Sequence, residues 1–379
     1  MKREIPKVVF TGGGSGGHLS IMKALLDYLS DEYGKDEVKE KIHVVGGRVG
    51  MIGDSGKSID ERIIPSFGVP YTLIRGGKFH RALRFTTIKL FFGVIPGFID
   101  SFAVLKKHSP DIVFATGGYV TLPMIIIAKL LGIRVVIHEQ THTAGLTNKI
   151  GARFADKVLT TFPESKRYFP EKKVKLTGNI IRAEVFAKKT KNQELTSFVK
   201  FAKNQNKSIM YVTGGSLGAH KINEFILRNI DAIVENFRVI WQIGGNKYHN
   251  DYQKILDLIK TNNLHKNIFV AEYFTEELGY ILDSSNVVVC RPGINTLYEL
   301  AALNKSAVMI PLWVTSASDQ ETNALWFKSN FNGEILKEGE FSYKEFQSAV
   351  EKVMKKQVAN PATFKVGSSL EVWEEIVSI

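Results

Sequence analysis

Residues 8–18 read VVFTGGGSGGH, and residues 209–219 read IMYVTGGSLGA. Each stretch is a short apolar run that enters a glycine-rich loop and then a segment with helical spacing. A buried strand, a glycine turn and a helix N-terminus together can bind phosphate, because free backbone N–H groups and the helix dipole point into the turn. Two such elements in opposite halves of the chain predict two nucleotide-fold domains that face one cleft.

The composition is that of a globular protein with anionic partners. The 379 residues suit two domains of ordinary size, and 44% hydrophobic with 23% charged residues gives no sign of disorder. The single cysteine, Cys290, excludes an internal disulfide and fits a reducing compartment. The net charge of +12 favours nucleic acid, phosphorylated ligands or an acidic membrane surface as partners.

The sequence predicts a protein that stays in the cytoplasm. Too few apolar residues lie between the start of the chain and the first glycines to form the core of a signal peptide. The apolar run at 90–99 stops at Asp100, and the run at 124–137 is broken by Lys129 and Arg134. Neither run is long enough to span a bilayer.

Short apolar runs alternate with helical stretches in both halves of the chain. Continuous runs of valine and isoleucine are typical of parallel strands that are covered on both faces. The expected strands are 7–10, 43–45, 112–115, 135–138, 158–160 and 174–176 in the first half, and 209–212, 239–242, 268–270, 287–290 and 307–310 in the second. This pattern predicts an α/β protein with two doubly wound domains, residues 1–181 and 182–360.

The last segment, 361–379, is expected to return to the first domain and complete it. Its residues from 368 onward form a short amphipathic helix, with Leu370, Trp373, Ile376 and Val377 expected on the apolar side.

His18 lies where the first glycine loop meets its helix, a position that favours contact with a ligand over a purely structural role. The glycines are denser than in a dinucleotide-binding Gly-x-Gly-x-x-Gly loop, and no acidic residue ends the next strand. A dehydrogenase is therefore not favoured.

Polar residues also follow the strand at 135–138. His138, Glu139 and Gln140 lie at the edge where open α/β sheets bind ligands, and Asn148 follows near the start of a helix. Asn148 suits a hydrogen bond to substrate or a helix cap. A metal site is the less favoured alternative, because adjacent His138 and Glu139 point to opposite faces of a strand.

The second half carries polar residues at corresponding places. Glu299, one turn into a helix after residues 291–293, could accept hydrogen bonds from ribose hydroxyls or simply stabilise the helix start. Gln320 and Asn323 are three residues apart, so a helix places both amides on one face, where they could bind sugar hydroxyls.

These motifs, taken in order, resemble the peptidoglycan N-acetylglucosaminyltransferases of glycosyltransferase family 28. The resemblance runs from the first strand to about Lys328. It is carried by TGGGSGGH at 11–18, HEQ at 138–140, AGLTNK at 144–149, Gly178-Asn179 with Arg182, GGSLGA at 214–219, and residues 293–299 with Gln320 and Asn323. It implies a GT-B fold, with two Rossmann-like doubly wound domains facing a cleft.

The resemblance also implies the reaction: inverting transfer of N-acetylglucosamine from UDP-N-acetylglucosamine to the undecaprenyl-linked acceptor lipid I, which gives lipid II. No Asp-x-Asp pair occurs to hold a metal, so neither metal nor cofactor is expected. The leaving UDP would then be stabilised by a helix N-terminus, Ser216 and Arg182.

Roles for individual residues follow from the same resemblance. On the donor side it implies Arg182 and Ser216 near the diphosphate, Phe274 and Thr275 around uracil, Thr296 near phosphate, Glu299 on the ribose, and Gln320 and Asn323 at the sugar. On the acceptor side it implies catalytic His18 and Asn148, with His18 a candidate general base, and the acceptor diphosphate on Ser15, Gly16, Gly17 and His18.

A membrane-binding surface is expected at residues 76–92. As a helix, this segment would place Phe79 and Leu83 in one apolar stripe with Arg81 and Arg84 beside it, which suits a protein lying on an anionic bilayer. The alternative is that these aromatics belong to the core. The resemblance likewise implies a peripheral protein on the cytoplasmic side of the cell membrane.

Two departures from the family pattern keep other functions open. Leu217 replaces a usual glutamine, and Asp319 replaces a usual histidine or glutamine. The alternatives are a UDP-N-acetylglucosamine 2-epimerase and a UDP-sugar-binding homologue with altered or lost transferase activity. Nucleic acid is not expected as a partner, because the basic residues are not interleaved with aromatics on a binding platform.

Overall fold

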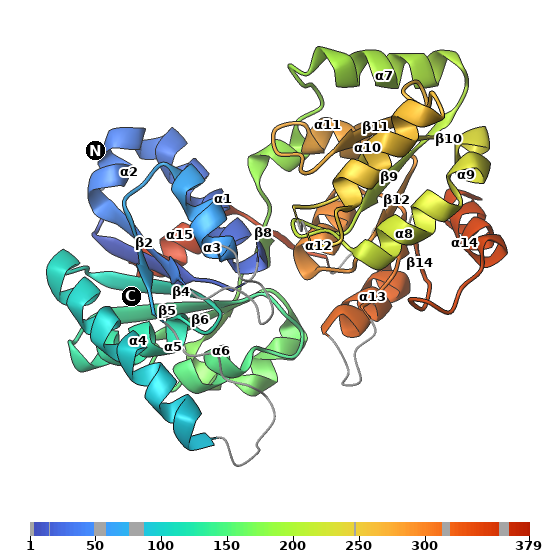
Figure 1. Ribbon diagram of the computed structural model, residues 1–379. Helices are drawn as coiled ribbons and strands as arrows, with labels where there is room; N and C mark the ends of the chain where they lie inside the picture. Colours follow the sequence, from blue (N-terminus) through green and yellow to red (C-terminus); the bar gives the residue numbers. More distant parts are fainter. Residues whose placement is uncertain are drawn as a thin grey trace. The chain divides into compact units, whose positions relative to one another are not determined.

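The computed structural model describes residues 4–14, 16–48, 58–75, 87–245, 248–312, 319–355 and 364–379, with only the backbone for 87–94. It comprises two compact units, Met1–Arg182 with Lys365–Ile379, and Ala183–Phe364 (Figure 1). Each unit contains its own parallel sheet with helices, which confirms the predicted fold class of two parallel-sheet α/β domains.

The first unit contains a seven-stranded sheet in the order β3-β2-β1-β4-β5-β6-β7, and every pairing is parallel. Its strands are β1 (Val8–Gly12), β2 (Ile42–Gly47), β3 (Tyr71–Ile74), β4 (Ile112–Gly117), β5 (Arg134–Glu139), β6 (Lys157–Thr160) and β7 (Val174–Leu176). Its helices include α1 (Gly16–Tyr33), α2 (Lys35–Lys41), α3 (Ile59–Ile63), α4 (Thr87–His108), α5 (Thr121–Leu130) and α6 (Leu146–Gly151).

Helices cover both faces of this sheet, which is why its central strands are apolar throughout. Phe10 of β1 packs into the layer that contains α1, whereas its neighbour Val9 packs into the layer that contains α4 and α5. This alternation is the period of two that a pleated strand imposes. All residues of β1, β2 and β4 are buried, as expected for parallel strands between two helical layers.

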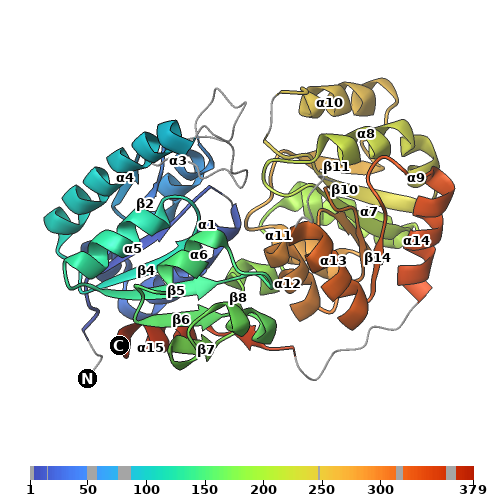
Figure 2. The same cartoon turned by 90° about the horizontal axis from the view of Figure 1, so that it is seen from below.

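The end of the chain belongs to the first unit (Figure 2). Strand β15 (Val366–Gly367) pairs in parallel with β8 (Asn179–Ile180), and α15 (Ser369–Val377) follows it. Trp373 and Ile376 of α15 join the apolar layer of α1. The prediction that Leu370 lies on the apolar side is wrong, because its side chain is 49% exposed and Val372 is buried instead. Leu370 lies about 110° around the helix from the centre of the buried stripe.

The second unit contains a six-stranded parallel sheet in the order β11-β10-β9-β12-β13-β14. Its strands are β9 (Ser208–Thr213), β10 (Phe237–Gln242), β11 (Ile268–Ala271), β12 (Val287–Cys290), β13 (Ala307–Met309) and β14 (Gly333–Ile335). Its helices are α7 (Gln193–Asn204), α8 (His220–Arg228), α9 (Ile230–Asn236), α10 (Asp251–Thr261), α11 (Leu278–Ser284), α12 (Ile294–Ala302), α13 (Asp319–Asn330) and α14 (Tyr343–Lys355) in the part of the chain described.

Both glycine loops lie where the strand order of a sheet reverses. Strand β1 lies between β2 and β4, and β9 lies between β10 and β12. In each sheet the chain first adds strands on one side of this central strand and then crosses over to add strands on its other side. Open α/β sheets bind ligands at the carboxyl ends of the strands at such a reversal point. Each unit therefore presents a candidate binding site at its own glycine loop.

None of the helices in the described ranges is both long enough and apolar enough to cross a membrane.

Candidate active site

In the first unit, the loop after β1 packs directly against the loop after β4. The Gly13 N–H donates to the carbonyl of Gly117 over 3.2 Å. Gly118 has a φ of +96°, and a Cβ atom added there would lie 2.0 Å from the carbonyl oxygen of Gly13. Only glycine allows this close approach, which brings the carboxyl ends of β1 and β4 together.

His18 lies in the first turn of α1 beside these loops. The Nε2 group of Gln140 lies 3.2 Å from its Nδ1 atom, and the Thr116 hydroxyl donates to its backbone carbonyl over 3.1 Å. A Cβ atom on Gly117 would lie 2.8 Å from His18 Cε1 and 3.3 Å from Asn148 Nδ2, so His18 and Asn148 flank the same glycine. Burial lowers the pKa of His18, although the charge of Glu139 and a hydrogen bond between the ring and the Thr116 backbone oppose this effect. The ring is therefore neutral at neutral pH.

Asp60 holds the first glycine loop in place, although no sequence pattern singles it out. Its buried carboxylate accepts a 3.0 Å hydrogen bond from the Gly14 N–H and a 2.7 Å bond from the Gly47 N–H. Burial raises the pKa of Asp60, and these two bonds lower it in part. Because Asp60 uses the Gly14 N–H, a bound anion must use N–H groups nearer the start of α1.

Glu139, at the end of β5, and Asn148, in the first turn of α6, form a buried polar network. The Glu139 carboxylate accepts bonds from the Thr141 N–H at 2.8 Å, the Thr141 hydroxyl at 2.7 Å and the Gly145 N–H at 2.9 Å. Asn148 Nδ2 donates to the same carboxylate over 2.9 Å. Asn148 Oδ1 is buried and has no hydrogen-bond partner among the described residues, so it can accept a bond from a ligand.

His138 is structural in this arrangement. Its Nε2 group donates to the carbonyl of Gly178 over 3.3 Å, and burial lowers its pKa to about 4. His138 and Glu139 thus contact different partners, as the strand geometry predicts. Across the described ranges, no group of three or more histidine, cysteine, aspartate or glutamate side chains is placed to hold a metal ion.

In the second unit, the loop after β9 is fixed by its own strand and by β10. The Thr213 hydroxyl accepts from the Gly215 N–H over 3.0 Å. Gly218 has a φ of +80°, and a Cβ atom there would lie 2.1 Å from the carbonyl of Ile243. Ser216 lies between these two glycines, half-buried, as expected of a residue that contacts a ligand.

Gln242, at the end of β10, links this loop to the predicted uracil segment. Its Nε2 group donates to the carbonyl of Gly215 over 3.2 Å, and its Oε1 atom accepts from the Phe274 N–H over 3.1 Å. The Phe274 ring is buried in the core, so its backbone, together with exposed Thr275, is what a ligand could contact. Gln242 was not predicted from the sequence, because a single amide at a strand end belongs to no motif.

The other predicted donor residues lie on α12 and α13. Gly293 precedes α12, Thr296 is in its first turn, and Glu299 follows one turn later with only 8% of its surface exposed. Asn323 Nδ2 donates to the carbonyl of Pro292 over 3.2 Å. Gln320 Oε1 accepts from the Leu312 N–H over 2.9 Å. The two amides therefore hold the loops that precede α12 and follow β13.

Six predicted site residues do not belong to the two groups of described residues above. Arg182 is the last residue of the first unit, whereas the other predicted donor residues belong to the second. Five lie outside the described residues, namely Ser15, Phe79, Arg81, Leu83 and Arg84.

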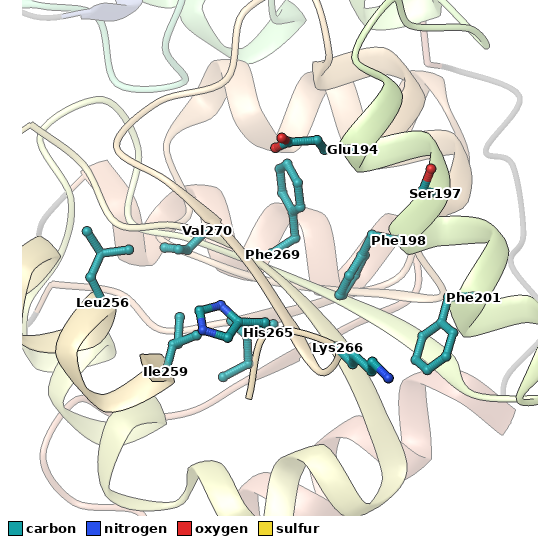
Figure 3. A pocket seen from close by; sticks show the side chains of 11 residues that line it. Glu194, Ser197, Phe198, Phe201, Leu256, Ile259, His265, Lys266, Phe269 and Val270 are labelled. Carbon is teal, nitrogen blue, oxygen red and sulfur yellow. The ribbon is translucent and has the colours of Figure 1, made fainter. Parts of the chain in front are cut away.

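A separate cavity of about 420 Å³ opens between α7, α10 and the edge strand β11 (Figure 3). Its walls include Phe198, Phe201 and Phe269, with Lys266 and Glu194 among the polar residues. Its lining contains none of the described residues assigned to the donor or acceptor.

Two doubly wound units, each with a glycine loop where its strand order reverses, define the class of α/β proteins with two Rossmann-like domains. The N-terminal domain of glycosyltransferase family 28 matches residues 8–160, and the C-terminal domain of that family matches residues 209–368. The chain belongs to glycosyltransferase family 28.

Its relatives share most of its length. A Staphylococcus carnosus protein named UDP-N-acetylglucosamine–N-acetylmuramyl-(pentapeptide) pyrophosphoryl-undecaprenol N-acetylglucosamine transferase is 34% identical over 349 residues, 92% of this chain and 89% of the relative. A Clostridium botulinum protein of the same name is 34% identical over 336 residues, 88% of this chain and 86% of the relative.

Solved structures with this fold include both enzyme types that the sequence left open. Acinetobacter baumannii MurG aligns with a TM-score of 0.64 and 21% identity, covering 99% of this chain and all of that one. The UDP-GlcNAc 2-epimerase of Methanocaldococcus jannaschii aligns with a TM-score of 0.61 and 16% identity, covering 98% and 99%. At these identities the structural likeness establishes the GT-B fold alone.

Proposed function

We propose that this protein transfers N-acetylglucosamine from UDP-N-acetylglucosamine to lipid I and so makes lipid II. The observation that carries the proposal is that relatives named for this reaction are 34% and 32% identical over 92% of the chain. The two matched family domains include both glycine loops. Among solved structures, a 2-epimerase from Methanocaldococcus jannaschii is 16% identical, and a Listeria monocytogenes protein described as a putative 2-epimerase is 14% identical.

The second unit would bind the donor. Backbone N–H groups of the loop around Ser216 and of the start of α12 would hold the diphosphate. Glu299 would accept hydrogen bonds from the ribose hydroxyls, a role that suits a nearly buried carboxylate at a helix start. The remaining assignments are Thr296 and Arg182 to phosphate, Phe274 and Thr275 to uracil, and Gln320 and Asn323 to the sugar.

The first unit would bind the acceptor. Its diphosphate would lie at the start of α1, on Gly16 and Gly17, because the Gly14 N–H is taken by Asp60. His18 and Asn148 would face the sugar and its hydroxyl. The buried, unpartnered Asn148 Oδ1 supports this assignment, since it offers an acceptor for a substrate N–H or O–H group.

In the reaction, the acceptor hydroxyl oxygen attacks the anomeric carbon of N-acetylglucosamine and forms the new glycosidic bond. The bond from that carbon to the UDP oxygen breaks, UDP leaves with the electron pair, and the hydroxyl proton passes to a base. Attack from the face opposite UDP inverts the configuration. Backbone N–H groups at helix starts, with Ser216 and Arg182, would stabilise the charge on UDP without a metal.

A membrane location is part of the proposal, because the acceptor carries a polyprenyl chain. On α4, the exposed Ile95, Ile99 and Phe102 recur at spacings of four and three residues and so share one face. The Lys106 amine lies 5.9 Å from the Phe102 ring, which adds a cation beside this face. An apolar helix face bordered by cations suits peripheral binding to an anionic bilayer, here on its cytoplasmic side.

The test is to incubate the purified protein with UDP-N-acetylglucosamine and a short-chain lipid I analogue, and to identify the products by mass. The proposal expects UDP and an acceptor heavier by one N-acetylhexosamine unit. Formation of UDP-N-acetylmannosamine without any acceptor, or of free N-acetylmannosamine and UDP after hydrolysis, would indicate a 2-epimerase instead. Donor binding with no turnover of either kind would indicate a binding homologue.

A further inference from the structure

Gln242 is the last residue of β10, the strand that lies between β9 and β11 in the sheet of the second unit. The carboxyl ends of parallel strands lie along one edge of a sheet. Gln242 therefore has the loop after β9 on one side and the segment after β11 on the other. In the proposed function, the loop after β9 binds the donor diphosphate and the segment after β11 binds uracil.

All four hydrogen-bonding positions of this buried amide are occupied. Its NH₂ group donates to the carbonyl oxygen of Gly215 over 3.2 Å and to the Thr213 hydroxyl over 3.1 Å. Its Oε1 atom accepts from the Phe274 N–H over 3.1 Å and from the Tyr211 hydroxyl over 3.3 Å. A glutamine amide offers two N–H donors and two acceptor lone pairs, so these four bonds use all of them.

Two backbone groups determine the orientation of the amide. The Gly215 carbonyl can only accept and the Phe274 N–H can only donate. The NH₂ group must therefore face Gly215, and the amide oxygen must face Phe274. A flipped amide would place like groups together at both ends, and an apolar side chain would leave both backbone groups without this partner. Joining the two segments requires a donor at one end of the side chain and an acceptor at the other.

Thr213 extends the network into the glycine loop. Its hydroxyl oxygen accepts the Gly215 N–H over 3.0 Å as well as the Gln242 NH₂ group, and it also forms a hydrogen bond with Tyr211. Gly215 is thus held at both its N–H and its carbonyl. The next residue is Ser216, which is assigned to the diphosphate. The same network therefore sets the position of the diphosphate loop and of the backbone at Phe274.

We propose that Gln242 is a positioning residue that couples recognition of uracil to binding of the diphosphate in the nucleotide donor. The proposal deepens the proposed function and rests on it for the identity of the donor. Because its hydrogen-bonding positions are taken by the protein, Gln242 acts through the segments at Gly215 and Phe274 and not by contact with the nucleotide. Without this amide each segment is free to shift alone, which weakens both the preference for uracil and the gain from the second phosphate.

Nucleotide binding tests the proposal without turnover. Calorimetric Kd values for UDP, CDP and UMP give two ratios. The ratio of the Kd for CDP to that for UDP reports recognition of uracil, and the ratio for UMP to UDP reports the contribution of the second phosphate. The proposal expects Gln242→Leu to lower both ratios at least about fivefold.

The ratios separate positioning from stability. A variant that is merely less stable binds all three nucleotides less well by the same factor, so both of its ratios stay unchanged. The exposed Gln193 on α7 provides the matched control, and Gln193→Leu should change neither ratio.

Variants of Thr213 test one side of the network alone. Thr213→Val removes the hydroxyl that holds the Gly215 N–H but keeps the bond between Gln242 and Phe274. The UMP ratio should therefore fall, whereas the CDP ratio should stay within about twofold of the wild-type value. Thr213→Ser restores the hydroxyl and should restore the UMP ratio. These two variants also decide the question if Gln242→Leu does not fold.

Three results would overturn the proposal: a folded Gln242→Leu protein that keeps both ratios, one in which a single ratio changes, or a Thr213→Val protein with the wild-type UMP ratio. A wild-type protein that binds UDP no more tightly than CDP and UMP would contradict the proposed function itself, and this inference with it.

Discussion

Asn148 donates to Oε2 of Glu139 over 2.9 Å, and both side chains are almost fully buried. The same carboxylate accepts the N–H groups of Thr141 and Gly145, so it joins the end of β5 to the start of α6. Because Asn148 and His18 flank Gly117, this network also fixes the position of Asn148 relative to His18. Buried networks of this kind are rigid when every donor is satisfied.

Replacing Glu139 by glutamine should destabilise the first unit. The amide offers only one acceptor oxygen, and its NH₂ group would face donors that the carboxylate now satisfies. We expect the free energy of unfolding to fall by about 2 kcal/mol, the usual cost of leaving a buried donor unsatisfied. Urea denaturation checks this value. The exposed Glu276→Gln is the control, and an equal effect in both variants would contradict the account.

Replacing Glu299 by alanine should weaken donor binding. Loss of charge-assisted hydrogen bonds to a ribose corresponds to about 1.5–3 kcal/mol, so the KM for UDP-N-acetylglucosamine should rise at least about tenfold. The KM for the acceptor should stay the same. Steady-state kinetics with each substrate varied in turn checks this, with the exposed Glu272→Ala as the control. An effect confined to the acceptor would contradict the assignment.

His138 should make the protein sensitive to acid. Its pKa is about 4 in the folded protein, against the ordinary histidine value of 6.5, so below pH 6.5 the unfolded chain takes up a proton that the folded one does not. Stability is then lost as the pH falls from 6.5 to 4, by about 3 kcal/mol in total. His138→Gln should lack this part of the loss, as measured by urea denaturation at pH 7.5 and 4.5. Identical losses in both proteins would refute the assignment.

Cys290 should report unfolding. It is fully buried on β12, and burial raises the pKa of its thiol to about 12, so no reactive thiolate is present in the native state. We expect an aromatic disulfide reagent to modify the native protein at least about a thousandfold more slowly than the urea-unfolded chain. Modification at comparable rates would show that β12 opens readily.

The sequence predicted the strands that are buried on both faces, because their apolar runs need no knowledge of the rest of the fold. It also predicted the edge strands β7 and β11, which are only partly buried. The edge strand β3 was not predicted, since only Ile74 of its four residues is buried. The same holds for the short strands β8, β14 and β15, which consist of two or three residues.

In the candidate sites, too, the residues that belong to a local sequence pattern were predicted, and those that depend on distant contacts were not. The glycine loops, His18, Asn148 and Glu299 were found because each follows a recognisable strand or lies in a motif. Asp60 was missed because its partner Gly14 is 46 residues away in the sequence, and only the fold brings them together. The contacts of Gln242 with Gly215 and of Gln140 with His18 likewise depend on the fold, and no local pattern encodes them.

The central claim is that this enzyme transfers N-acetylglucosamine with inversion and without a metal. The most direct test is to determine the linkage of the product made from α-linked UDP-N-acetylglucosamine and a lipid I analogue in excess EDTA. We predict a β-linked N-acetylglucosamine on the acceptor, formed at the rate seen without EDTA. An α-linked product, or no product once metal is removed, would contradict the account.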